Sequence, residues 1–221
     1  MSANHSLLLV EGDVTDLLPE VFDCFDLMMT GNIEIAKGLA EIWDLTNWPR
    51  RGKPRNQVHK AVLYNGTWTA ILDREMNMIL DEDKCVACAR RLRTRVFGYI
   101  AESVSQTAGI FYFTPEKERV FSIQNNELVE DFGSPLPQEN GIAFHTMLED
   151  GPMRVSRRMG FSDSLFAHPT SKVMIVGMVD PIRSRTVATG TSTYVTGMVN
   201  RNGSKVTAPP SRPEKPWWKL W

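Results

Sequence analysis

The fold is decided by residues 60–126. This segment contains, in order, KAVLYNGTWTAILD (60–73), DEDKCVACARRLRT (81–94), VFGYIAESV (96–104), GIFYFT (109–114) and RVFSIQ (119–124). Four of these stretches are rich in β-branched and aromatic residues, which favour strands. The stretch at 81–94 instead spaces its apolar residues as a helix does. The segment therefore predicts a hairpin, a helix and a second group of antiparallel strands.

The first hairpin is predicted to turn at Asn65-Gly66. Asn-Gly readily takes the positive φ angles of a type I′ turn, so we expect a two-residue loop in which Tyr64 pairs with Thr67 and Leu63 with Trp68. Side chains alternate between the two faces of a strand. One face of this hairpin then carries Leu63, Trp68, Ala70 and Leu72, and we expect Trp68 to be a core residue.

The charges at 81–94 favour a helix. Asp81, Glu82 and Asp83 lie where a helix N-terminus is positive, and the arginines at 90–95 lie where its C-terminus is negative. Cys85, Cys88 and Leu92 recur at steps of three and four residues, so one apolar stripe can lie on the sheet.

The rest of the chain predicts further elements around this unit. A strand at 6–10 leads into a helix at 14–25 that carries Pro19 in its first turn, where a helix tolerates proline. The other expected elements are a helix at 33–45, an edge strand at 128–132, short helices at 142–159 interrupted at Gly151-Pro152, and a buried strand at 173–179. We therefore predict an α+β fold, with a mostly antiparallel sheet and helices packed on one face.

The domain organisation follows from length and composition. The chain has 221 residues, of which 42% are hydrophobic and 23% charged, as in ordinary globular proteins. We expect one domain over residues 1–182 and a flexible, basic tail rich in Thr, Ser and Pro over 183–221. Three cysteines do not make a disulfide framework, and the longest apolar run, Leu7–Val10, is too short to span a bilayer. These features predict a cytoplasmic protein.

The charge is divided unevenly along the chain. Residues 183–221 hold seven Lys and Arg against one Glu, which leaves 18 bases and 25 acids in the remainder. An acidic body argues against nucleic acid as a partner and favours a basic protein. The basic and aromatic residues of Trp48–Arg55 resemble a single-strand nucleic-acid contact. With only one aromatic among them, a solvated loop is the preferred interpretation.

Cys85 and Cys88 form a Cys-x-x-Cys pair, which occurs in redox dithiols and in zinc sites. The acids at 81–83 would raise the pKa of these thiols, and the sequence has no second pair at ligand spacing. We therefore expect the two cysteines to pack in the core as small apolar side chains. No metal site is predicted from them.

Two stretches resemble the Toprim domain of primases and related nucleotidyl enzymes. They are LLLVEG (7–12) and MILDED (78–83), which is followed by a helix. The resemblance implies an acid/base role for Glu11 and a Mg²⁺ site at Asp81 and Asp83, since Mg²⁺ prefers oxygen ligands. The chain departs from the Toprim pattern in having an Asn-Gly hairpin between the motifs and Lys84-Cys85 where a glycine is usual. Capping of the helix explains the same aspartates.

The order of elements over residues 60–140 resembles uncharacterised bacterial α+β proteins, some of which look like immunity proteins of polymorphic toxin systems. That resemblance implies a non-enzymatic binding scaffold without a cofactor. The leading hypothesis is a protein-interaction module such as an immunity-type inhibitor of a basic toxin. The alternative is a Mg²⁺-dependent nucleotidyl or phosphoryl-transfer enzyme with Glu11, Asp81 and Asp83 as its catalytic residues.

The chain ends in PWWKLW (216–221). Trp217, Trp218 and Trp221 combine a large apolar surface with a polar N–H, which suits an interface. With Lys219, they are predicted to bind an apolar groove of a partner. Alternatives are a weak contact with a membrane surface and a strap on the acidic body of the chain itself.

Overall fold

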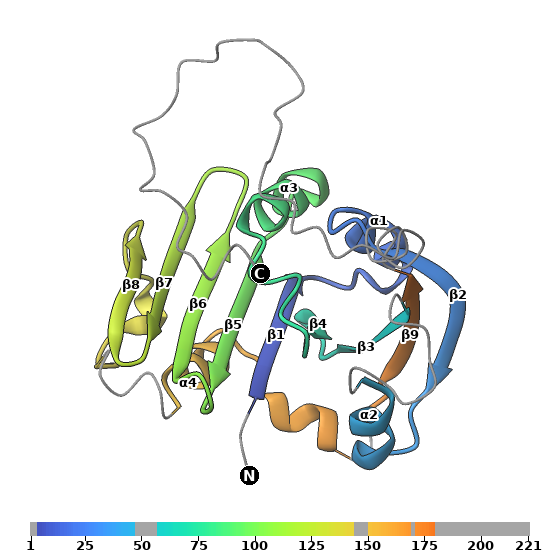
Figure 1. Cartoon of the computed structure of the whole chain (residues 1–221). Helices are drawn as coiled ribbons and strands as arrows, with labels where there is room; N and C mark the ends of the chain where they lie inside the picture. Colours follow the sequence, from blue (N-terminus) through green and yellow to red (C-terminus); the bar gives the residue numbers. More distant parts are fainter. Residues whose placement is uncertain (1–3, 47–56, 144–149, 169–170, 180–221) are drawn as a thin grey trace, which may run out of the picture.

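The computed structural model describes residues 4–46, 57–143, 150–168 and 171–179. Within these ranges the chain forms one antiparallel sheet of nine strands in the order β2-β9-β3-β4-β1-β5-β6-β7-β8 (Figure 1). The strands are β1 (Asn4–Glu11), β2 (Met28–Ile35), β3 (Gln57–Tyr64), β4 (Trp68–Leu72), β5 (Val96–Glu102), β6 (Thr107–Phe113), β7 (Glu118–Gln124), β8 (Glu127–Phe132) and β9 (Met174–Val179).

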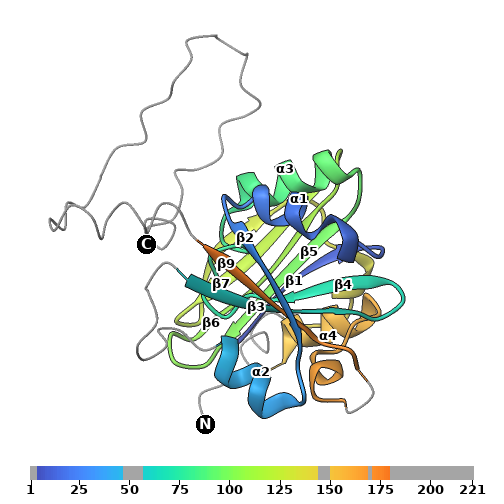
Figure 2. The same ribbon diagram turned by 90° about the vertical axis from the view of Figure 1, so that its right-hand side faces the viewer.

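Four α-helices of the described ranges cover the sheet. They are α1 (Leu18–Asp23), α2 (Leu39–Thr46), α3 (Glu82–Leu92) and α4 (Gly151–Arg158). Helices α1 and α3 lie over one face, and α2 and α4 lie over the other (Figure 2). The predicted α+β class and the mostly antiparallel sheet are confirmed, but the helices lie on both faces of the sheet instead of one.

The reason for two covered faces is visible in β1. Leu7 and Leu9 pack on the α2/α4 face, while Leu8 and Val10 pack on the α1/α3 face. Side chains of a strand alternate between faces, so a run of four apolar residues leaves no polar face for water. Each face of the sheet therefore needs its own layer of helices.

The β3–β4 hairpin has the predicted faces but a different register. Tyr64 pairs with Thr69 and Leu63 with Ala70, two residues further along β4 than predicted. The side chain of Asn65 accepts hydrogen bonds from the N–H groups of Thr67 (3.0 Å) and Trp68 (2.8 Å), which widens the loop. A shift of two residues preserves the side-chain alternation, so Leu63, Trp68 and Ala70 are buried together on the α2/α4 face.

Helix α3 and the strands after it agree with the prediction. Asp81 caps the helix by accepting a hydrogen bond from the Lys84 N–H (3.3 Å), and Arg93 ends it in the left-handed conformation (φ 50°). Cys85 and Cys88 are free thiols buried on the α1/α3 face, which confirms their packing role. Burial raises the pKa of the Cys85 thiol well above its ordinary value.

Two further local predictions are wrong. The helix expected at 33–45 is instead the end of β2 followed by α2, because Ile33–Ile35 pair with β9, about 140 residues away in sequence. Gly151-Pro152 begins helix α4 and does not interrupt one, since proline fits the first turn. The predicted flexible tail and the loop at 48–55 lie outside the described residues.

Candidate functional site: the open edge of strand β2

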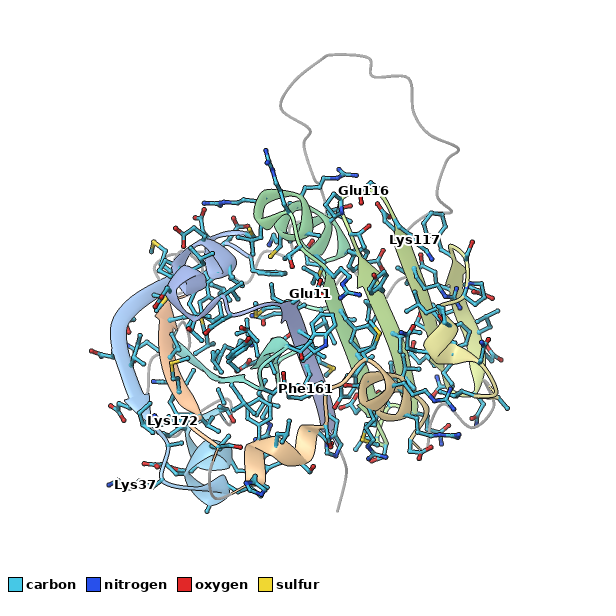
Figure 3. All side chains as sticks on the ribbon, turned by 180° about the vertical axis from the view of Figure 1, so that it is seen from behind. Glu11, Lys37, Glu116, Lys117, Phe161 and Lys172 are labelled. Carbon is cyan, nitrogen blue, oxygen red and sulfur yellow. The ribbon has the colours of Figure 1, made fainter. Side chains whose placement is uncertain are left out.

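The structure does not bring Glu11, Asp81 and Asp83 together. Glu11 ends β1 and forms an ion pair with Arg95, beyond the C-terminus of α3 (Figure 3). Asp81 caps the other end of this 11-residue helix, which at 1.5 Å per residue is about 16 Å long. Residues 78–80 form a turn, whereas the Toprim resemblance implies a strand there. Among the described residues, no group of three or more His, Cys, Asp or Glu is arranged to hold a metal ion.

Lys60 belongs to a closed buried cluster. Its Nζ donates to Asp73, to Glu75 and to Asn77 Oδ1 (3.0 Å), which uses all three ammonium protons. The other oxygen of Asp73 accepts the N–H groups of Met78 (2.9 Å) and Ile79 (3.1 Å). Burial lowers the pKa of Lys60, but the two carboxylates outweigh that effect and raise it overall. The cluster holds the turn after β4 against β3, so we assign it a structural role.

Arg119 forms a second closed cluster under the end of β8. Its Nε and Nη2 donate to the two oxygens of Glu139 (2.9 and 2.7 Å), and its Nη1 donates to Asp131. Glu139 also accepts the N–H of Leu136 (2.7 Å). The guanidinium thus ties β7 to the loop after β8, and it is not available to a ligand.

Strand β2, in contrast, presents an open edge. It ends the sheet, and of the described strands only β9 pairs with it. The N–H of Ala36 donates to the carbonyl of Val173 (2.9 Å), so the backbone groups of Ala36 point toward the β9 side of the strand. Backbone groups of an antiparallel strand point alternately to its two sides. Ile33 and Ile35 therefore direct their N–H and C=O groups outward from the sheet.

The side chains of β2 favour pairing of this edge with another strand. Met28, Ile33 and Ile35 are 57%, 50% and 59% exposed, and Glu34 is the one charged residue of the strand. The opposite edge strand, β8, carries three acids in six residues (Glu127, Glu130 and Asp131) and a register shift opposite Ser122 and Ile123. Charges on an edge strand discourage strand pairing. Both described edges expose apolar side chains, Leu128 (60%) and Phe132 (41%) on β8 among them, but β2 carries one charge where β8 carries three, so β2 is the less charged edge.

A small pocket lies inside this edge, on the α2/α4 face. The pairing of β2 with β9 shifts between Met29 and Ile33, so that the chain at 30–32 bulges opposite Gly177. The pocket has a volume of about 110 Å³. Its lining residues come from β2, α2, β3 and β9 and are Asn32, Glu34, Leu45, His59, Ile175 and Gly177.

Charges of both signs lie around the pocket, and Glu34 is the one carboxylate among its described lining residues. Glu34 projects from β2 beside the pocket, and none of the described residues forms an ion pair with it. Lys37 and Lys172 lie further along, at the end of β2 that leads to α2 (Figure 3). The backbone N–H of Lys37 donates a hydrogen bond to the side-chain carboxylate of Glu41 in α2. Among the described residues, Glu34 is thus a carboxylate of the pocket without an ion-pair partner.

Sequence reasoning missed this edge because residues 33–45 matched helical spacing. The alternation Ile33-Glu34-Ile35 is also typical of a strand, and the Gly31-Asn32 pair before it is typical of a bulge. A Gly-Asn pair followed by alternating apolar and charged residues is the sequence signal that could have predicted strand β2. The predicted contact residues Trp217, Trp218, Lys219 and Trp221 lie outside the described residues.

Comparisons with other proteins found no match to this chain. No family model, curated protein or solved structure matches the chain. In the described ranges, none of the helices has both the length and the apolar character needed to cross a membrane. The described part of the chain is an α+β protein whose β2 edge is open and carries a single charge, and the function is inferred from that edge.

Proposed function

We propose that this protein is a non-enzymatic protein-binding module that takes an extended, basic segment of a partner as an additional strand beside β2. The observation that carries the proposal is the outward direction of the Ile33 and Ile35 backbone groups, next to exposed apolar side chains. Peptide recognition by strand addition uses such an edge, where main-chain hydrogen bonds supply affinity and alternate side chains supply specificity.

An added strand would lie about 4.8 Å from β2 and bury part of its exposed surface. Ile33 and Ile35 pair with Val176 and Met174, which face α1 and α3, so partner residues on that side would cover the two isoleucines. The intervening partner residues would face the pocket beside Glu34. An apolar residue alternating with a polar one is thus the pattern that fits this edge.

The charge balance of the chain supports a basic partner. Residues 1–182 hold 25 acids against 18 bases, and opposite charges accelerate encounter and select against acidic competitors. The resemblance of residues 60–140 to immunity proteins implies a binding scaffold, and the acidic charge of the chain favours a basic partner such as a toxin in the cytoplasm. Binding of this kind requires no cofactor.

The C-terminal residues Trp217, Trp218, Lys219 and Trp221 would supply a second contact. Tryptophan-rich ends suit an apolar groove of a protein partner. A single short motif binds membranes only weakly and reversibly, so a lipid surface is the less favoured target.

A peptide-display selection on the full chain tests the proposal. Short random peptides would be selected on the wild type and then measured against Ile35→Pro. Proline removes the outward N–H but leaves the hydrogen bonds to β9, and the preceding residue already has the extended conformation that proline favours. The matched control, Ile35→Val, keeps the N–H and the β-branched side chain.

The proposal predicts that the selected peptides lose binding to Ile35→Pro and keep it for Ile35→Val. A thermal melt of each variant shows whether the fold is retained. If Ile35→Pro is misfolded, Ile35→Lys replaces it, since a lysine on the edge repels a basic strand without removing a hydrogen bond. Peptides that bind all four proteins equally would contradict the proposal.

A further inference from the structure

We infer that the pocket behind β2 is a specificity pocket that takes one Lys or Arg side chain of the added strand. This inference rests on the proposed function, because it assigns a side-chain preference to the same edge. It names Glu34 as the group that recognises the cation, with Asn32 beside it.

The pocket exists because β9 has a glycine where a side chain would fill it. Gly177 pairs with His59 on β3 and lies opposite the bulge of β2. A Cβ atom at 177 would lie 2.8 Å from Thr30 Oγ1, whose hydroxyl donates to the Gly177 carbonyl (3.1 Å). Only glycine therefore leaves both this hydrogen bond and the space beside it intact.

The lining of the pocket matches a long cationic side chain. Glu34 and Asn32 belong to the edge strand, so they offer oxygen acceptors on the side of the pocket nearest to an added strand, and Leu45 and Ile175 form apolar walls further in. A volume of about 110 Å³ exceeds the roughly 10 to 15 Å³ that one water requires, so the pocket has room for part of a side chain. A carboxylate ligand would instead meet the charge of Glu34.

The register of an added strand places one residue at this pocket. A residue directly opposite Glu34 shares its face of the sheet, which is the α2/α4 face, because Glu34 pairs with Ile175 on that face. Its neighbours on either side point to the opposite face, toward Ile33 and Ile35. The preference for Lys or Arg is therefore confined to a single position of the bound segment.

The selection described above tests this preference when it is repeated on Glu34→Gln. We expect Lys or Arg to be enriched at one position of the peptides selected on the wild type, and the enrichment to disappear on Glu34→Gln. Glu127→Gln on β8 is the matched control, since it makes the same change of charge at the other edge of the sheet and should leave the enrichment intact.

A titration then measures the size of the effect. Replacing the enriched Lys or Arg of a selected peptide by norleucine should weaken binding to the wild type about tenfold, or about 1.4 kcal/mol, and should change binding to Glu34→Gln much less. Peptides that require the β2 edge but show no Lys or Arg preference would overturn the pocket assignment and leave the proposed function standing. Peptides insensitive to Ile35→Pro would overturn both.

Discussion

At the scale of single residues, the buried charges determine how the chain turns between β4 and α3. The turn holds Met76 at a positive φ (55°) and places two N–H groups on Asp73. Composition and spacing predicted the ends of this segment, but they did not predict that Lys60 lies beneath it. A lysine in a strand is usually a solvated residue. Its burial depends on acceptors 13 to 17 residues away that only the fold brings near.

Replacing Lys60 by Met should strongly destabilise the protein. The change keeps the length of the side chain but leaves Asp73 and Glu75 buried without their cation, which costs roughly 3 to 5 kcal/mol. Urea denaturation measures the loss. Lys117→Met is the control, because Lys117 lies exposed on the turn between β6 and β7 (Figure 3). Equal denaturation midpoints for the two variants would show that the cluster contributes little.

Alkaline pH should destabilise the fold through its buried thiols. The ordinary thiol pKa is 9.0, and burial raises the pKa of Cys85 well above that value, so the folded state keeps a proton that the unfolded state loses. This stabilisation is complete below pH 9.0 and declines as the pH rises further. In urea titrations at pH 7 to 10, Cys85→Ala/Cys88→Ala should show a smaller decline than the wild type. Parallel declines would argue against a contribution from the thiols.

At the scale of elements, the sequence predicts best where pairing is local. The strands β5, β6 and β7 follow one another in both sequence and sheet, and α3 has its caps within its own segment. Strand β2 is different because its pairing partner is β9, close to the end of the described chain. Periodicity within a short window carries no information about such a distant partner. The same limit explains why the candidate site, which β2 and β9 form together, was not predicted.

A substitution of Trp68 tests the prediction that this face of the β3–β4 hairpin is buried in the core. Its ring is buried on the α2/α4 face, and its Nε1 donates to the carbonyl of Met159 (2.7 Å) after α4. Trp68→Ala should therefore cost roughly 3 to 5 kcal/mol of unfolding free energy through lost burial and a cavity. A guanidinium titration of the variant checks this value. An unchanged midpoint would mean that the ring does not anchor α4 to the sheet.

At the scale of the whole molecule, the two edges of the described sheet differ in charge. The β8 edge carries acids and an irregular register, and the Arg119 cluster ties it to the following loop. The β2 edge carries exposed isoleucines and a pocket with one carboxylate. Charged residues discourage strand pairing, so the less charged β2 edge is the one that favours an added strand. This asymmetry is what connects the fold to the proposed binding function.

Hydrogen exchange of the backbone amides of β2, measured by NMR on the full chain with and without a selected peptide, tests strand addition at this edge. The peptide should slow exchange at Ile33 and Ile35, whose N–H groups point outward, and should leave Glu34 nearly unchanged because its N–H already points toward β9. Slowed exchange in this alternating pattern is the expected result. Exchange at Ile33 and Ile35 that stays fast while the peptide is bound would contradict strand addition at β2.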